Sequence, residues 1–261
     1  MSKRSEPRRV LREAERNQLV EIAADQLFAD EKESREALDY LVQKRKFNEK
    51  LLREFGVGYV PYHVQNDDGE RHELAGKIVY PIYNQYNEIV AVSSRNWREG
   101  ARQKFWHEAF DKPFYLYGFN VAKKYIQKYR KAILVEGEHD TMSMHKGGIK
   151  VTCGILGSAP QAFQIATLMR YCDEIYTLFD ADVAGERARD MMAKIWEQFN
   201  VDGYGVKFYN AEFPHAKELG LENDKDIDPD FYIKKFGAKN VMKIINEAKK
   251  IRRCKNVRSS T

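Results

Sequence analysis

Acidic residues stand at positions where a chain can hold divalent metal ions. Glu136 directly follows the apolar run Ala132–Val135, and Asp180 and Asp182 follow a second apolar run, Ile175–Phe179. Mg²⁺ prefers hard oxygen ligands and keeps waters or substrate phosphates in its shell, so one or two carboxylates for each ion are enough. This pattern indicates metal-assisted phosphoryl transfer. The other interpretation is that these are solvated turn acids that cap helices.

The segment Lys131–Asp190 must position these acids. Short β-rich runs bounded by glycines and polar turns are typical of buried parallel strands, and helical spacing follows each run. Acids at the carboxyl ends of two neighbouring strands lie where open α/β sheets bind ligands. Asp180 and Asp182, two apart, would face the same way in an extended chain. Glu136 would join them from the adjacent strand end.

The residues around these acids resemble a known domain. V-E-G-E-x-D at Val135–Asp140 and F-D-A-D-x-A-G at Phe179–Gly185 are similar to the TOPRIM domain that bacterial-type DNA primases, topoisomerases and some nucleases share. Each motif follows its own apolar run, in the family's order. The resemblance implies that Asp140 belongs to the site. It also implies that Asp228 and Asp230 form the third acidic pair of primases.

The resemblance extends upstream of the TOPRIM motifs. Residues 40–59, which end in Phe55-Gly56-Val57-Gly58-Tyr59, look like the entry to the primase polymerase core, which topoisomerases lack. Two β-rich runs, Gly76–Tyr83 and Ile89–Arg95, flank a polar turn and predict a hairpin. A similar primase hairpin ends in an arginine near the nucleotide, and Arg95 matches it. Ser93-Ser94 replaces the usual glycines at this point.

Residues 102–118 interleave basic and aromatic side chains, a pattern that suits unpaired nucleic acid because cations meet phosphates and rings stack on bases. Core packing is the other interpretation for most of these rings. The primase pattern here has two lysines before Leu-Tyr-Gly, and Lys104 and Lys112 match them ahead of Leu116–Gly118. The resemblance implies that both contact template or nucleotide. Trp106 departs from the family's small polar neighbour.

Composition limits the remaining possibilities. The chain has 261 residues and a net charge of +5 despite its acidic cluster, so basic surface elsewhere fits a phosphate-rich partner. No apolar run of about 18 residues and no apolar leader are present, so neither a membrane span nor a secretory signal is expected. Cys153, Cys172 and Cys254 have no C-x-x-C spacing, so no zinc site is expected.

We therefore predict an α/β fold, in which a small N-terminal α/β subdomain precedes a TOPRIM domain whose mostly parallel sheet is flanked by helices. The expected helices cover residues 19–28, 37–42, 47–55, a segment ending at 199, and 231–250, and a further strand covers 205–209. The predicted parts are a basic arm (1–18), the primase-core subdomain (19–129), the TOPRIM domain (130–248) and a basic tail (249–261). The arm and the tail, which include Arg16, Lys249 and Arg258, fit either nucleic-acid contact or solvated ends.

The predicted function is that of a DNA-dependent RNA primase core, a nucleotidyltransferase that makes short RNA primers on single-stranded DNA from ribonucleoside triphosphates. Its predicted cofactor is Mg²⁺ or Mn²⁺, without zinc. The predicted residues are catalytic Glu136, Asp140, Asp180 and Asp182; metal ligands Glu136, Asp180, Asp182, Asp228 and Asp230; and nucleotide or template contacts Arg95, Lys104 and Lys112.

Two other functions remain open: a TOPRIM nuclease that uses the same carboxylates, and a non-catalytic protein that binds single-stranded nucleic acid. A topoisomerase is disfavoured because its nucleophilic tyrosine needs a separate large domain. Bacterial primases place a zinc module before this core and a helicase-binding domain after it, and this sequence has neither the cysteines expected for the first nor the length expected for the second. We therefore expect a stripped core, as a phage or plasmid might encode, working in a bacterial cytoplasm with a replicative helicase or a separate template-recognition protein.

Overall fold

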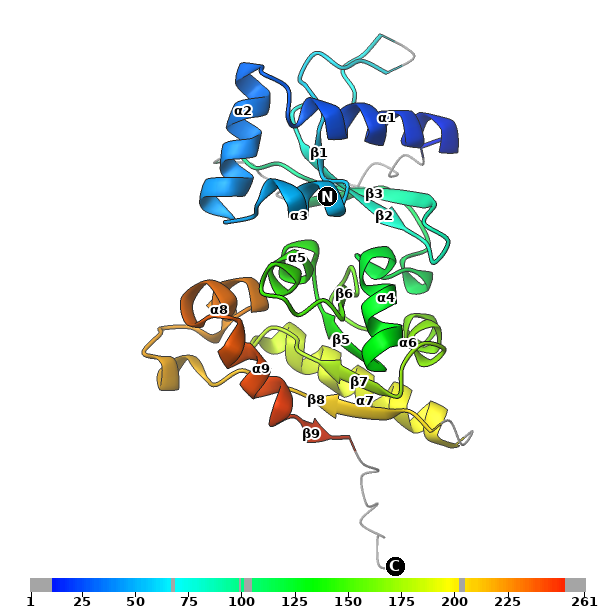
Figure 1. Ribbon diagram of the computed structural model, residues 1–261, viewed down its shortest axis with the longest axis vertical. Helices are drawn as coiled ribbons and strands as arrows, with labels where there is room; N and C mark the ends of the chain where they lie inside the picture. The colour runs from blue at the N-terminus through cyan, green and yellow to red at the C-terminus, as the bar shows by residue number, and fades with distance from the viewer. Residues whose placement is uncertain (1–10, 67–68, 99, 101–104, 202–204, 252–261) are drawn as a thin grey trace, which may run out of the picture. The chain divides into compact units, whose positions relative to one another are not determined.

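The computed structural model describes residues 11–66, 69–98, 100, 105–201 and 205–251. The chain divides into two compact units, residues 1–121 and 122–261, and each has its own sheet (Figure 1). The predicted α/β class is confirmed. Within the described ranges, no helix is long and apolar enough to cross a bilayer.

The first unit contains an antiparallel sheet of four strands in the order β1-β2-β3-β4. The strands are β1 (Gly58–Tyr59), β2 (Ile78–Tyr83), β3 (Ile89–Arg95) and β4 (Phe105–His107). The predicted hairpin is confirmed: β2 pairs with β3 from Ile78 opposite Arg95 to Tyr83 opposite Ile89. Asn87 adopts a φ of 68° in the connecting turn, a conformation that asparagine tolerates better than most residues.

Among the described residues of this unit, three α-helices and two shorter helical turns accompany the sheet. They are α1 (Glu13–Gln26), α2 (Lys32–Asp39), α3 (Glu49–Glu54), the π-helical turn η1 (Tyr40–Lys44) and the 3₁₀ turn η2 (Lys112–Phe114). The Asn48 side chain caps α3 by accepting a hydrogen bond from Leu51 N at 2.9 Å. Gly56, at a φ of 66°, ends the helix as its sequence position predicts.

A buried ion pair ties α1 to the sheet. Glu108 is fully buried, and its carboxylate accepts hydrogen bonds from Leu11 N, Val92 N and the Arg16 guanidinium, whose Nη2 lies 2.7 Å from Oε1. Arg16 also donates to Leu11 O at 2.9 Å. The interpretation of Arg16 as part of a solvated basic arm is therefore wrong. Residues 1–10 of that arm lie outside the described residues.

The second unit contains a five-stranded sheet in the order β6-β5-β7-β8-β9, parallel except for β9. The strands are β5 (Lys131–Val135), β6 (Thr152–Gly154), β7 (Glu174–Thr177), β8 (Lys207–Asn210) and β9 (Lys249–Lys250). The helices are α4 (Phe119–Tyr129), α5 (Glu138–Lys146), α6 (Ala162–Met169), α7 (Val183–Val201), α8 (Pro229–Phe236) and α9 (Ala238–Asn246), with 3₁₀ turns η3 (Ala216–Leu219) and η4 (Asp224–Asp226). The mostly parallel sheet is thus confirmed.

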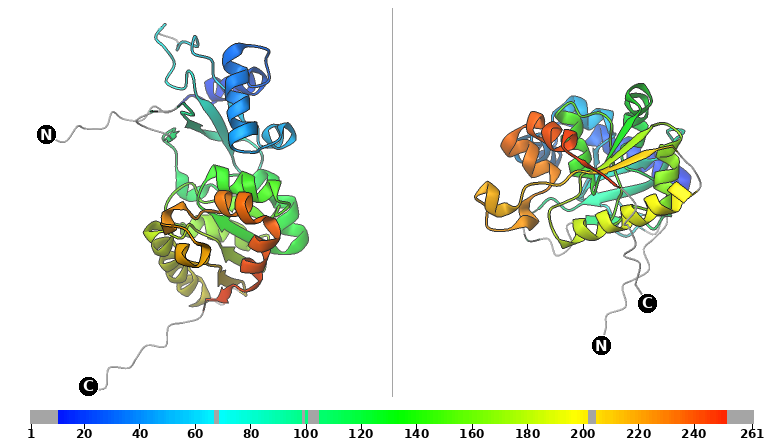
Figure 2. Two further views of the ribbon diagram at one scale, coloured as in Figure 1. Left: turned by 90° about the vertical axis from the view of Figure 1, so that its left-hand side faces the viewer. Right: turned by 90° about the horizontal axis from the view of Figure 1, so that it is seen from below.

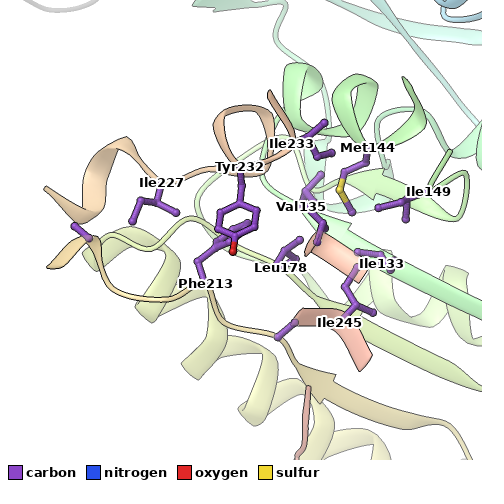
Figure 3. Close-up of a cluster of buried hydrophobic side chains, with 13 residues drawn as sticks. Ile133, Val135, Met144, Ile149, Leu178, Phe213, Ile227, Tyr232, Ile233 and Ile245 are labelled. Carbon is purple, nitrogen blue, oxygen red and sulfur yellow. The ribbon is translucent and has the colours of Figure 1, made fainter. Parts of the chain in front are cut away.

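Helices cover both faces of this sheet. Ile133 and Val135 of β5 pack in one buried cluster with Met144 of α5, Ile233 of α8 and Ile245 of α9 (Figure 3). Helix α7 lies on the opposite face from α9 (Figure 2). The near-continuous apolar character of β5 and β7 follows from burial on both sides.

The expected single helix over residues 231–250 is wrong. Gly237, at a φ of 80°, separates α8 from α9, because that left-handed conformation interrupts helical hydrogen bonding. After α9 the chain forms β9 opposite β8, and Ile251 N donates to Phe208 O at 2.8 Å. The first two residues of the predicted basic tail therefore belong to the sheet, and residues 252–261 lie outside the described part.

We predict that Arg16→Met lowers the free energy of unfolding of the first unit by about 3 kcal/mol, because it leaves the Glu108 carboxylate buried without its cation. Arg12→Met is the control, since the Arg12 side chain is 74% exposed at 3.8 Å from Glu15, and its replacement should change stability by less than about 1 kcal/mol. Urea unfolding would measure both. Equal, small effects of the two substitutions would show that the buried pair contributes little.

Candidate metal and active site

Two acids follow neighbouring parallel strands at one edge of the second sheet. Glu136 comes directly after β5, and Asp180 comes three residues after β7, which pairs with β5 in parallel register. Asp180 N donates to Glu136 Oε1 at 3.3 Å. The predicted meeting of these acids at the carboxyl ends of two strands is therefore confirmed.

The Asp180-Ala181-Asp182 turn leads directly into α7. Asp182 Oδ1 accepts hydrogen bonds from Ala184 N and Gly185 N, both at 2.9 Å, and so caps the helix. A Cβ added to Gly185 would lie 1.9 Å from Asp180 O, so only glycine permits this approach. Because Oδ1 of Asp182 accepts both of these hydrogen bonds, Asp182 has a structural role beside its predicted role as a metal ligand.

The third acidic pair reaches the same edge from α8. Asp228 caps this helix, and its Oδ1 accepts from Phe231 N at 2.6 Å. Ala181 N donates to Ile227 O at 3.0 Å, which fixes the segment before Asp228 beside the Asp180 turn. The sequence could place this pair only through the family resemblance, because Ile227 lies 45 positions after Asp182.

Asp140 and Asp230 join α5 to α8. Asp140 accepts from Gly137 N at 3.2 Å through Oδ2 and from Asp230 N at 3.3 Å through Oδ1. Asp230 is buried; its Oδ1 accepts from the Ser143 hydroxyl, and its Oδ2 lies 2.6 Å from Lys234 Nζ. Both Asp230 oxygens thus already have partners, and as a metal ligand this acid would use the acceptor capacity that remains on them.

The local environment disfavours a negative charge on Asp180. Burial, followed by the charges of Asp140, Glu136 and Asp228, raises its pKa to about 9. The fold therefore holds several carboxylates within electrostatic range of one another.

Two further acids of the group show the same direction. Burial raises the pKa of Glu136, and the charges of Asp182 and Asp228 raise it further. Burial, followed by the charges of Asp228 and Asp230, holds the pKa of Asp140 well above its ordinary value. Clustered titratable groups whose pKa values are displaced in this way are typical of functional sites.

These acids suit a divalent cation. Asp180 Oδ1 is buried and has no hydrogen-bond partner, and a hard cation would satisfy this oxygen. Across the described ranges, no three His, Cys, Asp or Glu side chains are already gathered closely enough to hold an ion. Repulsion between carboxylates opposes such a gathering, and the charge of a bound cation would offset it.

Arg189 is a residue of this site that the sequence interpretation missed. Its Nη1 donates to Asp180 O at 3.2 Å, and its charge acts to lower the pKa of Glu136, against the larger effect of burial. It lies four residues after Gly185 on α7, so both approach Asp180 from one side of the helix. The contact of Arg189 with Asp180 can be inferred only once α7 is known to begin at Val183.

The predicted nucleotide contacts lie in the first unit. Arg95 ends β3, where it pairs with Ile78 of β2, and its side chain is partly buried. Lys112 begins η2, with Nζ 5.9 Å from the centre of the Phe110 ring. Lys104 lies outside the described residues. The second-unit structure brings the acids together, whereas the contacts of these basic residues with nucleotide or template remain predictions.

Residues 133–227 match the Toprim-like family, which confirms the predicted TOPRIM domain. The chain is 26% identical over 269 aligned residues to the DNA primase of Aquifex aeolicus, an alignment that covers 91% of this chain and 51% of that protein. It is also 26% identical over 243 residues to the DNA primase of Borreliella burgdorferi, covering 82% of this chain and 43% of that protein. The chain thus spans about half the length of these relatives.

Solved structures share the fold. The Aquifex aeolicus primase structure with zinc-binding and RNA polymerase domains superposes with a TM-score of 0.75 at 24% identity, covering 90% of this chain and 60% of that one. A DnaG primase catalytic domain bound to single-stranded DNA gives a TM-score of 0.76 at 18% identity, covering 90% and 78%. The predicted resemblance to a primase catalytic core is confirmed.

We predict that Asp180→Asn stabilises the metal-free protein near neutral pH. A carboxyl group whose pKa is higher in the folded state opposes folding once the pH exceeds its unfolded pKa of about 4. This cost grows until the pH reaches the folded pKa, and each pKa unit of displacement corresponds to about 1.4 kcal/mol. The gain should therefore exceed roughly 1 kcal/mol at pH 7.5 and shrink toward pH 4.

Thermal unfolding in the presence of a chelator at several pH values would measure this gain. Glu197→Gln, on the exposed side of α7, is the matched control and should change the melting temperature little at any pH. A lower melting temperature for Asp180→Asn at pH 7.5 would contradict the prediction and mark the carboxylate as structural.

Proposed function

We propose that this chain is the catalytic core of a DNA-dependent RNA primase, which joins ribonucleotides into short RNA primers on single-stranded DNA. The observation that carries the proposal is the buried, unpartnered oxygen of Asp180 among acids from three segments at one sheet edge. The similarity to DNA primases over most of this chain supports the reaction class.

Glu136, Asp180, Asp182, Asp228 and Asp230 are the proposed ligands for Mg²⁺ or Mn²⁺. Bound at these residues, such ions would supply charge neutralisation at the reacting phosphate and a lower pKa for the attacking hydroxyl. No zinc role is proposed. Burial raises the pKa of both Cys153 and Cys172, so neither readily forms the thiolate that zinc binds.

Four acids have proposed roles in the reaction. Glu136 is the proposed acceptor of the 3′-hydroxyl proton, because a carboxylate whose pKa is raised toward the working pH is a better base. Asp180 and Asp182 hold charge at the phosphate. Asp140 acts through geometry, since its two oxygens hold Gly137 N and Asp230 N and so set the spacing between β5 and α8.

The proposed substrates are ribonucleoside triphosphates and a single-stranded DNA template. The catalytic domain of a related primase has been solved bound to single-stranded DNA, which supports the template assignment. Arg95, Lys104 and Lys112 are the proposed contacts to phosphates. A replicative helicase or a separate template-recognition protein is the proposed partner, and the bacterial cytoplasm, for a host or phage replication system, is the proposed location.

A nuclease would use the same carboxylates, so the acids alone do not separate the two reactions. The primase relatives align over 82% and 91% of this chain, far beyond the Toprim-like segment, and the antiparallel first unit belongs to the shared fold. These observations favour synthesis over cleavage.

Incubation of the protein with single-stranded DNA, labelled ribonucleotides and Mg²⁺ or Mn²⁺ would test the function. We predict template-dependent RNA of short length from the parent and a loss of at least about 100-fold in Asp180→Asn and Asp182→Asn, because each removes charge at the site. Glu197→Gln is the control and should retain synthesis. Cleavage of the DNA without RNA synthesis by the parent would instead establish a nuclease.

We predict that Lys104→Ala and Lys112→Ala each weaken single-stranded DNA binding and lower its salt dependence. The slope of log affinity against log salt should fall by roughly 0.7 for each phosphate of the single strand that the variant no longer neutralises. Fluorescence anisotropy of a labelled oligonucleotide at several salt concentrations would measure it, with Lys194→Ala on the exposed side of α7 as control. Unchanged slopes for both variants would show that these lysines do not bind phosphates.

A further inference from the structure

The second unit has a pocket at the end of the sheet opposite the acids. It lies toward the amino ends of β5 and β6, where Lys131 begins β5 and Gly147–Val151 leads into β6. Its volume is about 670 Å³, within the range that ligand sites occupy. Ile133, Ile149 and Ile245 form its floor, and Figure 3 shows them at one side of the buried cluster, away from Phe213.

The wall of this pocket includes two tyrosines on the last turns of α4, and an exposed lysine precedes each of them. Tyr125 and Tyr129 line the pocket and are four residues apart, so they share one side of the helix. Lys124 and Lys128 form a parallel row, with each Nζ about 5 Å from the ring of the next tyrosine in sequence. Tyr129 is 54% exposed, so much of its ring area is open to a ligand.

The positive charge around the pocket is only partly neutralised. Lys131 Nζ lies 3.1 Å from Glu174, which also faces Lys207 Nζ at 3.8 Å. In the ranges that the structure describes, Lys124 and Lys128 contact tyrosine rings and pair with no carboxylate. The α4 side of the pocket therefore attracts an anion.

Aromatic rings beside unpaired lysines over an apolar floor match the chemistry of an unpaired nucleotide. Its base is flat and apolar on its faces, and its phosphate is anionic. Stacking on tyrosine tolerates every base, and lysine contacts follow the backbone without reading sequence. An apolar peptide would fill the floor but would leave the lysine row without a counter-charge.

We propose that this pocket, which we call the tyrosine–lysine pocket, binds an unpaired nucleotide of a single-stranded DNA or RNA chain. The site is distinct from the acids, because it lies at the opposite ends of the strands. It holds one strand by base stacking at Tyr125 and Tyr129 and by phosphate contact at Lys124 and Lys128. This inference goes beyond the proposed function and does not depend on the reaction that the acids perform.

Equilibrium binding without metal or nucleotides tests the proposal separately from catalysis. The probes are labelled oligo-dT and oligo-U, which lack self-structure and distinguish a DNA strand from an RNA strand. Tyr129→Ala should weaken binding of at least one probe about tenfold, whereas Tyr86→Ala, at a 73% exposed tyrosine of the first unit, should not. Lys124→Ser combined with Lys128→Ser should lower the salt slope by roughly 1.4.

A charge exchange at Met242 separates electrostatics from structural damage. Met242 lines the pocket from α9 and is 37% exposed, so either charge can be placed there. Met242→Glu should weaken binding of the oligonucleotide, and Met242→Lys should strengthen it. A structural perturbation would move both variants in the same direction.

Photocrosslinking of an oligonucleotide carrying 5-iododeoxyuridine locates the strand directly, and we expect the crosslink at Tyr125 or Tyr129. The proposal is overturned if Tyr129→Ala and the double lysine variant bind both probes with unchanged affinity and slope. It is also overturned if Met242→Glu and Met242→Lys change affinity in the same direction, which would be consistent with an apolar protein partner instead.

Discussion

The burial of several carboxylates at one sheet edge is the constraint on which the second unit depends. Burial alone disfavours the charge of Asp180, and its acidic neighbours add to that cost. Such a cluster persists only if the rest of the fold holds it in place. The sheet itself brings the acids together, because Glu136 directly follows β5 and Asp180 comes shortly after β7, its parallel neighbour.

Backbone hydrogen bonds supply the remaining restraint. Three hydrogen bonds donated by main-chain N–H groups connect the acidic segments: Asp180 N to Glu136, Ala181 N to Ile227 O, and Asp230 N to Asp140. These main-chain groups cannot move unless the elements that contain them also move. Gly185 and Arg189 act from α7 on the Asp180 carbonyl. The acids therefore occupy defined places although their charges repel, and the proposed metal-assisted transfer would use this preorganisation.

Much of this arrangement could be predicted from the sequence, and the rest could not for physical reasons. The apolar runs that end at Glu136 and Asp180 predicted both strands, because the hydrophobic pattern of a strand and the polar residues that bound it are local in the sequence. The break at Gly237 was missed because helical spacing continues on both sides of it. The Arg16–Glu108 pair joins residues 92 apart, and the contact of Arg189 depends on where α7 begins. A local sequence pattern shows neither contacts between distant residues nor the residue at which a helix begins.

The two ends of the parallel strands have opposite electrostatic character. The carboxyl ends gather acids whose charges a bound cation would offset. At the amino ends, the tyrosines of α4 line a pocket with an apolar floor, beside the exposed Lys124 and Lys128. The acids at the carboxyl ends repel a nucleic-acid backbone unless metal is bound, whereas the lysines near the amino ends attract it with or without metal. A strand held at the tyrosine–lysine pocket would thus be retained without competing for the acids, so that binding and chemistry occupy separate ends of one sheet.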